Sequence, residues 1–344
     1  MLKRLQWVDF SKGIVIILVV VAHVMHRGTF EIAFIYTFHM PFFFVMAGYL
    51  LNVAKYEKRY NDFVNKSFKR LVFPYFLANF LYYPVWYIFC HLMGRLAIYD
   101  WAYRAPLDVL RNIFIGNIPA VNIWLVLHPL WFLMCLFFAE ILYLKLCIGF
   151  KEKTTKIFGA VCILSVAGYI LGAHLPLPLG IDIALVAQFF IFVGNFIKKN
   201  NLLEKMNFGS CVIFLAMVFA ITYLNGKITM DGREYGNLIL LYIGGIVGSL
   251  FVMKISMAAA DIGNKISDFI SYCGKQSMII LVLHIPIIAV TYNLTLAINP
   301  KYAELGLRFL PIGVETFIIA VAVIFPVIIA KKFGDKSIVK YFCV

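Results

Sequence analysis

The sequence predicts an all-α polytopic membrane protein with about ten transmembrane helices and both termini in the cytoplasm. Of its 344 residues, 63% are hydrophobic and 14% are charged, with a mean hydropathy of +0.90. A soluble globular domain is nearer half apolar and a quarter charged. Apolar windows long enough to cross a bilayer recur along the chain. The connecting segments alternate between rich and poor in Lys and Arg.

Ten apolar windows of roughly 17–25 residues define the predicted spans. They lie at about 10–27, 34–53, 72–94, 128–148, 157–174, 180–197, 208–225, 236–256, 277–297 and 308–330. A basic head precedes the first window, as in a signal peptide, but no small-x-small cleavage site follows, so we interpret it as a retained helix. Neither a 20–50-residue repeat nor an attached soluble domain is apparent, so 1–344 is predicted to be one membrane domain.

Charge orients these spans. With the N-terminus in the cytoplasm, every predicted inner segment holds more Lys and Arg than its outer neighbours. The net charge of +14 therefore reflects membrane topology and attraction to anionic lipid. It does not indicate nucleic acid, because the basic residues are spread over loops and not gathered in one groove.

The seven cysteines show neither paired nor metal-ligand spacing, and most stand in apolar runs. We expect no disulfide framework and no metal site. The longest outer segment, 95–127, is too apolar for a free linker, so we expect it to dip into the membrane or lie on its outer surface.

Ionisable side chains inside predicted spans are costly, and they usually face a bundle interior or a wet cavity. Those within the spans are His23, His39, Glu140, His284 and Glu315. At a rise of about 1.5 Å per residue, His23 lies roughly 16 Å from the inner face and His39 roughly 8 Å below the outer face. The two rings then reach similar depth in adjacent helices, which suggests a catalytic or proton-handling centre. The alternative is a set of hydrogen-bonded structural groups, with the two glutamates paired to buried basic residues or backbone donors.

A second constellation is basic. Lys66, Lys69 and Arg70 fall at i, i+3 and i+4 on one helical face before Pro74. Such a face at the inner mouth suits a phosphorylated ligand, since Arg makes forked contacts to phosphate and Lys acts as a point charge. The same residues are also compatible with ordinary inner-face charge that contacts anionic lipid headgroups.

Five separate stretches, taken together, resemble the integral-membrane acyltransferase 3 family, in particular its sugar O-acetyltransferase branch related to fucose 4-O-acetylases. They are WVDFSKGIVIILVVVAHV (7–24), FHMPFFFVMAGYL (38–50), KSFKRLVFPYF (66–76), HPLWFLMCLFFAE (128–140) and YCGKQSMIILVLHIPI (272–287). In the first stretch, Asp9, Lys12 and His23 stand in the family's order.

The resemblance implies an O-acyltransferase of the bacterial cytoplasmic (inner) membrane. It would move acetyl from acetyl-CoA, a donor substrate, to a hydroxyl of a cell-surface or lipid-linked glycan. His23 would be the catalytic base, with His39 beside it, and Lys66, Lys69, Arg70 and Lys12 would bind the donor. Supporting residues would be Asp9, Trp131, Glu140, Ser277 and His284.

The sequence departs from the family at two points. Many members carry Arg-x-x-Arg, where this chain has Lys66-x-x-Lys69 followed by Arg70, and Lys keeps the charge but loses the fork. A family Ser-Gly in the second span is replaced by Ala47-Gly48.

The expected chemistry fits the residues. Phosphates of cytoplasmic acetyl-CoA would sit on the basic inner mouth, and the pantetheine arm would thread inward toward His23. A neutral imidazole suits deprotonation of a hydroxyl, and His39, Ser277 or backbone N–H groups would stabilise the oxyanion. Trp101, Trp124 and Trp131 would either stack on the sugar or anchor the membrane interface.

Two other functions stay open. A proton-coupled transporter or exporter would also use buried His and Glu, although inverted repeats and paired broken helices are not apparent. A membrane subunit that only scaffolds a polysaccharide synthase would have no need of His23.

Overall fold

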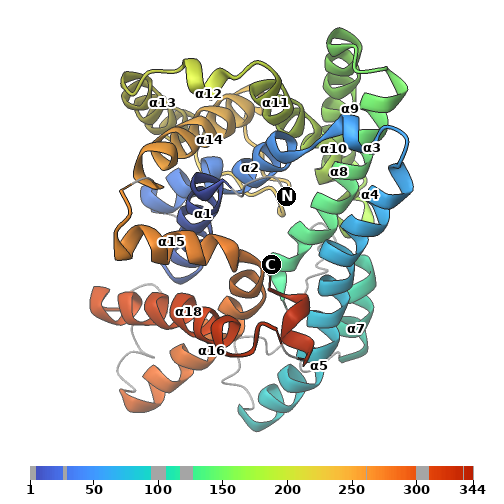
Figure 1. Cartoon of the computed structure of the whole chain (residues 1–344). Coiled ribbons are helices and arrows are strands. Elements are labelled where there is room, and N and C mark those ends of the chain that lie inside the picture. The colour runs from blue at the N-terminus through green and yellow to red at the C-terminus, as the bar shows by residue number, and fades with distance from the viewer. Residues whose placement is uncertain are drawn as a thin grey trace. The chain divides into compact units, whose positions relative to one another are not determined.

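The computed structural model describes residues 5–25, 29–93, 106–116, 127–260, 262–299, 310–335 and 337–343, and the regular elements in these ranges are helices joined by turns and irregular connectors (Figure 1). The one β-type pairing in these ranges is an isolated antiparallel bridge between Thr229 and Glu234. The chain divides into two compact units. Unit 1 comprises Met1–Phe43, Asn200–Ile228 and Tyr235–Val344, and unit 2 comprises Phe44–Lys199 and Thr229–Glu234.

The helix α2 (Phe30–Leu50) contributes to both units and continues through Pro41. The other helices of unit 1 are α1 (Gln6–Val24), α12 (Leu202–Lys205), α13 (Gly209–Asn225), α14 (Leu238–Ala260), α15 (Lys265–Lys275), α16 (Ser277–Ile298), α18 (Ile312–Phe333) and η7 (Ser337–Tyr341). Those of unit 2 are α3 (Val53–Tyr56), α4 (Tyr60–Ser67), η1 (Phe68–Val72), α5 (Phe73–Met93), α7 (Pro106–Ile115), η4 (His128–Leu130), α8 (Trp131–Gly149), α9 (Thr154–His174), η5 (Pro178–Gly180), α10 (Ile181–Val186) and α11 (Gln188–Lys199).

Within the described ranges, eight helices are long and apolar enough to cross a membrane. They are Gln6–Val24, Phe30–Leu50, Tyr60–Ile88, His128–Gly149, Thr154–His174, Leu238–Ala260, Ser277–Ile298 and Ile312–Phe333. The all-α polytopic class is therefore confirmed. The predicted seventh window contains the shorter α13, of 17 residues, so the total of ten spans and the side of the termini stay predictions.

The predicted sixth span is broken. Its two helices, Pro178–Val186 and Gln188–Lys199, meet at an angle of 49°. A bend releases backbone carbonyls from the helical ladder, and they need another donor in an apolar setting. The Gln188 side chain supplies one: its Nε2 donates to the carbonyls of Ala184, at 3.0 Å, and Ala139, at 3.1 Å.

Glycines allow close helix crossings in each unit. In unit 1, a Cβ on Gly13 would overlap the Ile270 carbonyl, and one on Gly274 would overlap the Asp9 carbonyl, so α1 and α15 touch backbone to backbone. In unit 2, Gly48 and Gly194 bring α2 and α11 equally close. Small residues at helix contacts are typical of membrane bundles, where van der Waals packing drives association.

The helix Tyr60–Ile88 contains one wide turn, η1, closed by a bond from the Phe73 N–H to the Phe68 carbonyl. Pro74 explains this turn. It has no N–H to donate, and its ring clashes with the carbonyl four residues earlier, which is that of Arg70. The helix accommodates both effects by opening one π-type turn instead of breaking.

Part of the predicted outer segment 95–127 is described, and it packs against α5. The Tyr75 hydroxyl donates to the Ile113 carbonyl at 2.7 Å, and the Phe114 ring lies 5.8 Å from Phe76 and 5.9 Å from Phe80. Tyr75, Phe76 and Phe80 lie well inside the apolar helix Tyr60–Ile88. Because α7 packs against them, it lies beside this helix and not beyond its end. This fits a segment that dips toward the membrane.

Connectors predicted on the same side of the membrane meet one another in unit 2. On the predicted inner side, Lys199 pairs with Glu152. On the predicted outer side, Gly116 abuts Leu179, and the segment Thr229–Glu234 reaches residues 128, 177 and 182. This grouping agrees with the alternation deduced from charge.

Candidate active site

His23 lies near the C-terminal end of α1 and is partly buried. Its Nδ1 is 2.7 Å from the Val19 carbonyl, one helical turn earlier. Because a carbonyl oxygen only accepts, this contact requires the proton on Nδ1, so Nδ1–H donates. In the neutral imidazole that makes this bond, Nε2 is the basic nitrogen.

His284 on α16 is the ring in contact with His23. The ring centroids are 5.1 Å apart and the planes meet at 73°. The His284 side chain is fully buried, its Nδ1–H donates to the Ile280 carbonyl at 3.0 Å, and its Nε2 has no hydrogen-bond partner. Unit 1 thus holds two imidazoles in contact, and the buried one keeps an unused acceptor.

His39, predicted beside His23, has a different ring neighbour. Its Nδ1–H donates to the Ile35 carbonyl at 2.9 Å, and its ring lies 4.8 Å from that of Tyr36. Ile35 and Tyr36 belong to a cluster that also includes Ala22 of α1, so this turn of α2 packs beside the His23 end of α1. The side chain is 4% exposed.

Four further residues that the sequence singled out in unit 1 lie near helix starts. Asp9 is in the first turn of α1 and 2% exposed, and Lys12, one turn later, is partly buried. Ser277 is the first residue of α16, seven residues before His284, which is about 10 Å along the axis. Ser277, which was predicted to stabilise the oxyanion, therefore lies two helical turns from His284 along α16. Glu315, in the first turn of α18, is 8% exposed.

The basic face lies in unit 2. Lys66, Lys69 and Arg70 are all exposed, and the last two belong to the wide turn η1. Arg70 pairs through Nη2 with Glu140 on α8, and the Ser67 hydroxyl donates to the same carboxylate oxygen at 3.3 Å. The Glu140 side chain is 7% exposed whereas Arg70 is 46% exposed. Glu140 therefore holds the Arg70 guanidinium through Nη2, while nearly half of the Arg70 side chain stays exposed.

Trp131 begins α8, is 6% exposed and packs edge-on against Phe132, with ring centroids 6.1 Å apart. This is a packed position in which the ring face is covered, so a sugar-stacking role receives no support from it. Trp101 and Trp124 lie outside the described residues.

Comparison with protein-family models decides the family. The model of the acyltransferase domain of family 3 matches residues 5–331, nearly the whole chain. The chain belongs to the acyltransferase 3 family. It is thus a membrane acyltransferase. Comparisons with curated proteins and with solved structures gave no significant match.

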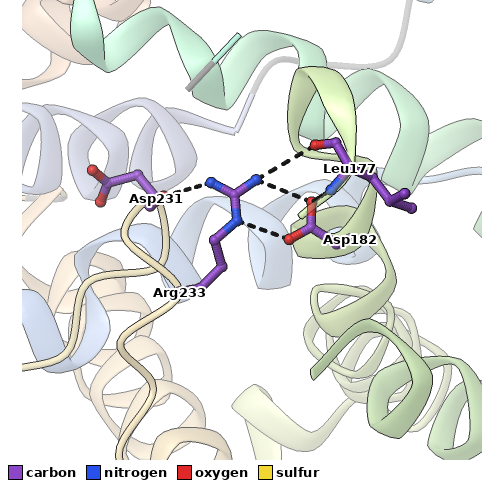
Figure 2. Close-up of polar contacts among 4 residues, drawn as sticks. All are labelled: Leu177, Asp182, Asp231 and Arg233. Atoms are coloured by element: carbon purple, nitrogen blue, oxygen red, sulfur yellow. Dashed lines mark hydrogen bonds and ion pairs between the residues drawn. The ribbon is translucent and has the colours of Figure 1, made fainter. Parts of the chain in front are cut away.

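This acyltransferase also contains a polar cluster that the sequence did not predict. Arg233 donates through Nε and Nη2 to the Asp182 carboxylate, at 2.9 and 3.1 Å, in the centre of Figure 2. The two residues are 51 positions apart, so spacing carried no signal of their pairing. The available signal was chemical: both are charges near predicted span ends, where an unpaired charge is costly.

Proposed function

We propose that this acyltransferase moves an acetyl group from cytoplasmic acetyl-CoA to a hydroxyl of a cell-surface or lipid-linked glycan, with His23 as the general base. The observation that carries the proposal is the His23–His284 pair. An ionisable pair within predicted spans marks a functional site by default, and here the bond from His23 Nδ1–H to the Val19 carbonyl assigns the role of base to Nε2.

In the proposed reaction, His23 Nε2 takes the proton of the acceptor hydroxyl while the oxygen attacks the thioester carbonyl carbon. The C–S bond then breaks, and the imidazolium returns its proton to the departing CoA sulfur. The products are the acetylated glycan and free CoA. His284 supports the cationic state of His23, because its unprotonated, buried Nε2 places a lone pair beside the imidazolium.

For the donor, we propose that Lys66, Lys69 and Arg70 bind the phosphates of CoA. Arg70 is suited to this role because Glu140 orients it while nearly half of its side chain stays exposed. Anionic lipid headgroups would compete for the same charges, so donor affinity should fall when the surrounding lipid is made more acidic.

The test uses the purified full chain in nanodiscs, labelled acetyl-CoA and a panel of glycan acceptors. We expect His23→Ala to abolish transfer while the protein stays folded. We expect His284→Gln to lower kcat about 10²-fold and to change the pH profile of kcat, since general-base catalysis contributes at least that factor. His174→Ala is the matched control, because His174 is an exposed histidine at the end of α9.

Full transfer by folded His23→Ala would refute the catalytic assignment. Glycan flux across liposomes without consumption of the acyl donor would favour the transporter instead. Consumption of succinyl-CoA in preference to acetyl-CoA would keep the reaction class and change the product.

A further inference from the structure

The segment Thr229–Glu234, between α13 and α14 in the chain, forms a tight hairpin that packs within unit 2. Its ends exchange two backbone hydrogen bonds, both of 2.9 Å, and the Thr229 hydroxyl donates to the Glu234 carboxylate at 2.8 Å. Arg233 adopts a left-handed conformation with φ of 59°. Such a conformation is costly for a side chain of this kind, and it persists only where surrounding contacts enforce it.

Those contacts come from the Arg233 guanidinium. Besides its two bonds to Asp182, it donates to the carbonyls of Asp231, at 2.9 Å, and Leu177, at 3.5 Å (Figure 2). The side chains of Arg233 and Asp182 are 5% and 0% exposed. Burying two charges is expensive unless geometry and hydrogen bonding compensate. Here the four hydrogen bonds of the Arg233 guanidinium compensate the burial, so the Arg233–Asp182 pair fixes the position of the hairpin within unit 2.

The carboxylate of Asp231 is directed away from the guanidinium, which touches only its backbone carbonyl (Figure 2). Its Oδ2 lies 3.1 Å from Nε2 of His128, at the start of η4. These side chains are 18% and 26% exposed, unlike the closed Arg233–Asp182 pair beside them. A rigid base thus holds the Asp231 carboxylate beside the His128 imidazole. Both side chains are partly exposed, although His128 Nε2 itself is buried.

We propose that Asp231 and His128 form a binding site for a sugar hydroxyl of the acceptor. A carboxylate accepts from a hydroxyl, and an imidazole can donate to or accept from one, so the pair matches a polyhydroxylated ligand. The chemistry favours a sugar over a cation, because no group of three or more metal-ligating side chains exists among the described residues. The connectors that carry the site are predicted on the outer side, where a glycan arrives. The identification of the ligand as the acceptor rests on the proposed function.

The experiment measures binding and transfer separately on the full chain in nanodiscs. Binding of methyl glycosides of common hexoses and 6-deoxyhexoses is followed by ligand-observed NMR, without acyl donor. We expect Asp231→Asn to weaken binding about tenfold or more, as expected for loss of a charged hydrogen bond. His128→Asn should weaken it as well. Glu234→Gln is the matched control in the same hairpin, and it should bind as the wild type does.

A positioning role for Arg233 is tested by Arg233→Lys, which keeps the charge and loses the fork. It should raise KM for the glycoside without changing KM for acetyl-CoA. Folding of each variant is checked by its thermal midpoint.

The outcomes separate the two proposals. If wild type binds a glycoside and Asp231→Asn does not, the site stands even where no acetyl is transferred, and only the proposed function fails. Equal binding by folded Asp231→Asn, or no glycoside binding by wild type, would overturn the site. Acetyl transfer with an unchanged acceptor KM in Asp231→Asn would overturn it too, while leaving the proposed function intact.

Discussion

Replacing Asp182 by Asn should destabilise unit 2 severely. The substitution keeps the size of the side chain but removes the charge that Arg233 meets through bonds of 2.9 and 3.1 Å, at 5% exposure. Breaking a buried ion pair on one side costs about 3–5 kcal/mol, because the remaining charge is left uncompensated. At about 2–4 °C per kcal/mol for a unit of this size, the thermal midpoint should fall by about 6–20 °C.

The assay is thermal unfolding of the detergent-solubilised protein, followed by intrinsic tryptophan fluorescence. The control is Asp62→Asn, since Asp62 pairs with Arg59 at 2.6 Å but the two side chains are 53% and 65% exposed. Exposed pairs contribute about 0–1 kcal/mol, so this variant should lose at most about 4 °C.

A double variant, Asp182→Leu with Arg233→Met, distinguishes the buried charge from lost packing. Apolar replacement of both partners is often neutral or stabilising, so the double variant should recover much of the loss. Equal midpoints for Asp182→Asn and Asp62→Asn would refute the reasoning. It would mean that the buried pair contributes no more than a surface pair.

Two further predictions concern a glycine and a glutamate. Gly274→Ala should lower the thermal midpoint by several degrees, because the new Cβ meets the Asp9 backbone carbonyl and overpacking costs about 1–3 kcal/mol. A Cβ on Gly159 meets nothing within 4 Å, so Gly159→Ala should leave the midpoint unchanged. Equal midpoints for the two variants would contradict the close crossing of α1 and α15. Glu140→Gln should raise KM for acetyl-CoA several-fold with little change in midpoint, because Arg70 loses its orienting charge but is 46% exposed; an unchanged donor KM in titrations of acetyl-CoA would separate Glu140 from donor binding.

Hydropathy and charge were enough to predict the all-α membrane class, because long apolar helices are the direct consequence of satisfying backbone groups in lipid. The bend before Gln188 was not predictable in this way. Its signal is one side-chain amide that bonds two carbonyls, and one of these lies on another helix.

The candidate site was predictable by residue type but not by partner. Sequence reasoning selected His23 and His284 because ionisable groups in spans are costly, and it then paired His23 with His39 by depth. Depth fixes the height of a ring but not the face of the helix from which it projects, and the ring in contact with His23 is that of His284. One alternative paired Glu140 with a buried basic residue or a backbone donor. The structure pairs it with Arg70, 70 positions away and 46% exposed.

The wide turn at Phe68–Val72 makes the length of this segment a constraint in its own right. Deleting one residue there would restore an ordinary α-helix and rotate everything before the turn by about 100° relative to α5. The Glu140 carboxylate on α8 would then face a different side of α4. Substitutions that keep a basic residue can be absorbed at this position, but a single-residue insertion or deletion cannot, even though the helix as a whole would remain helical.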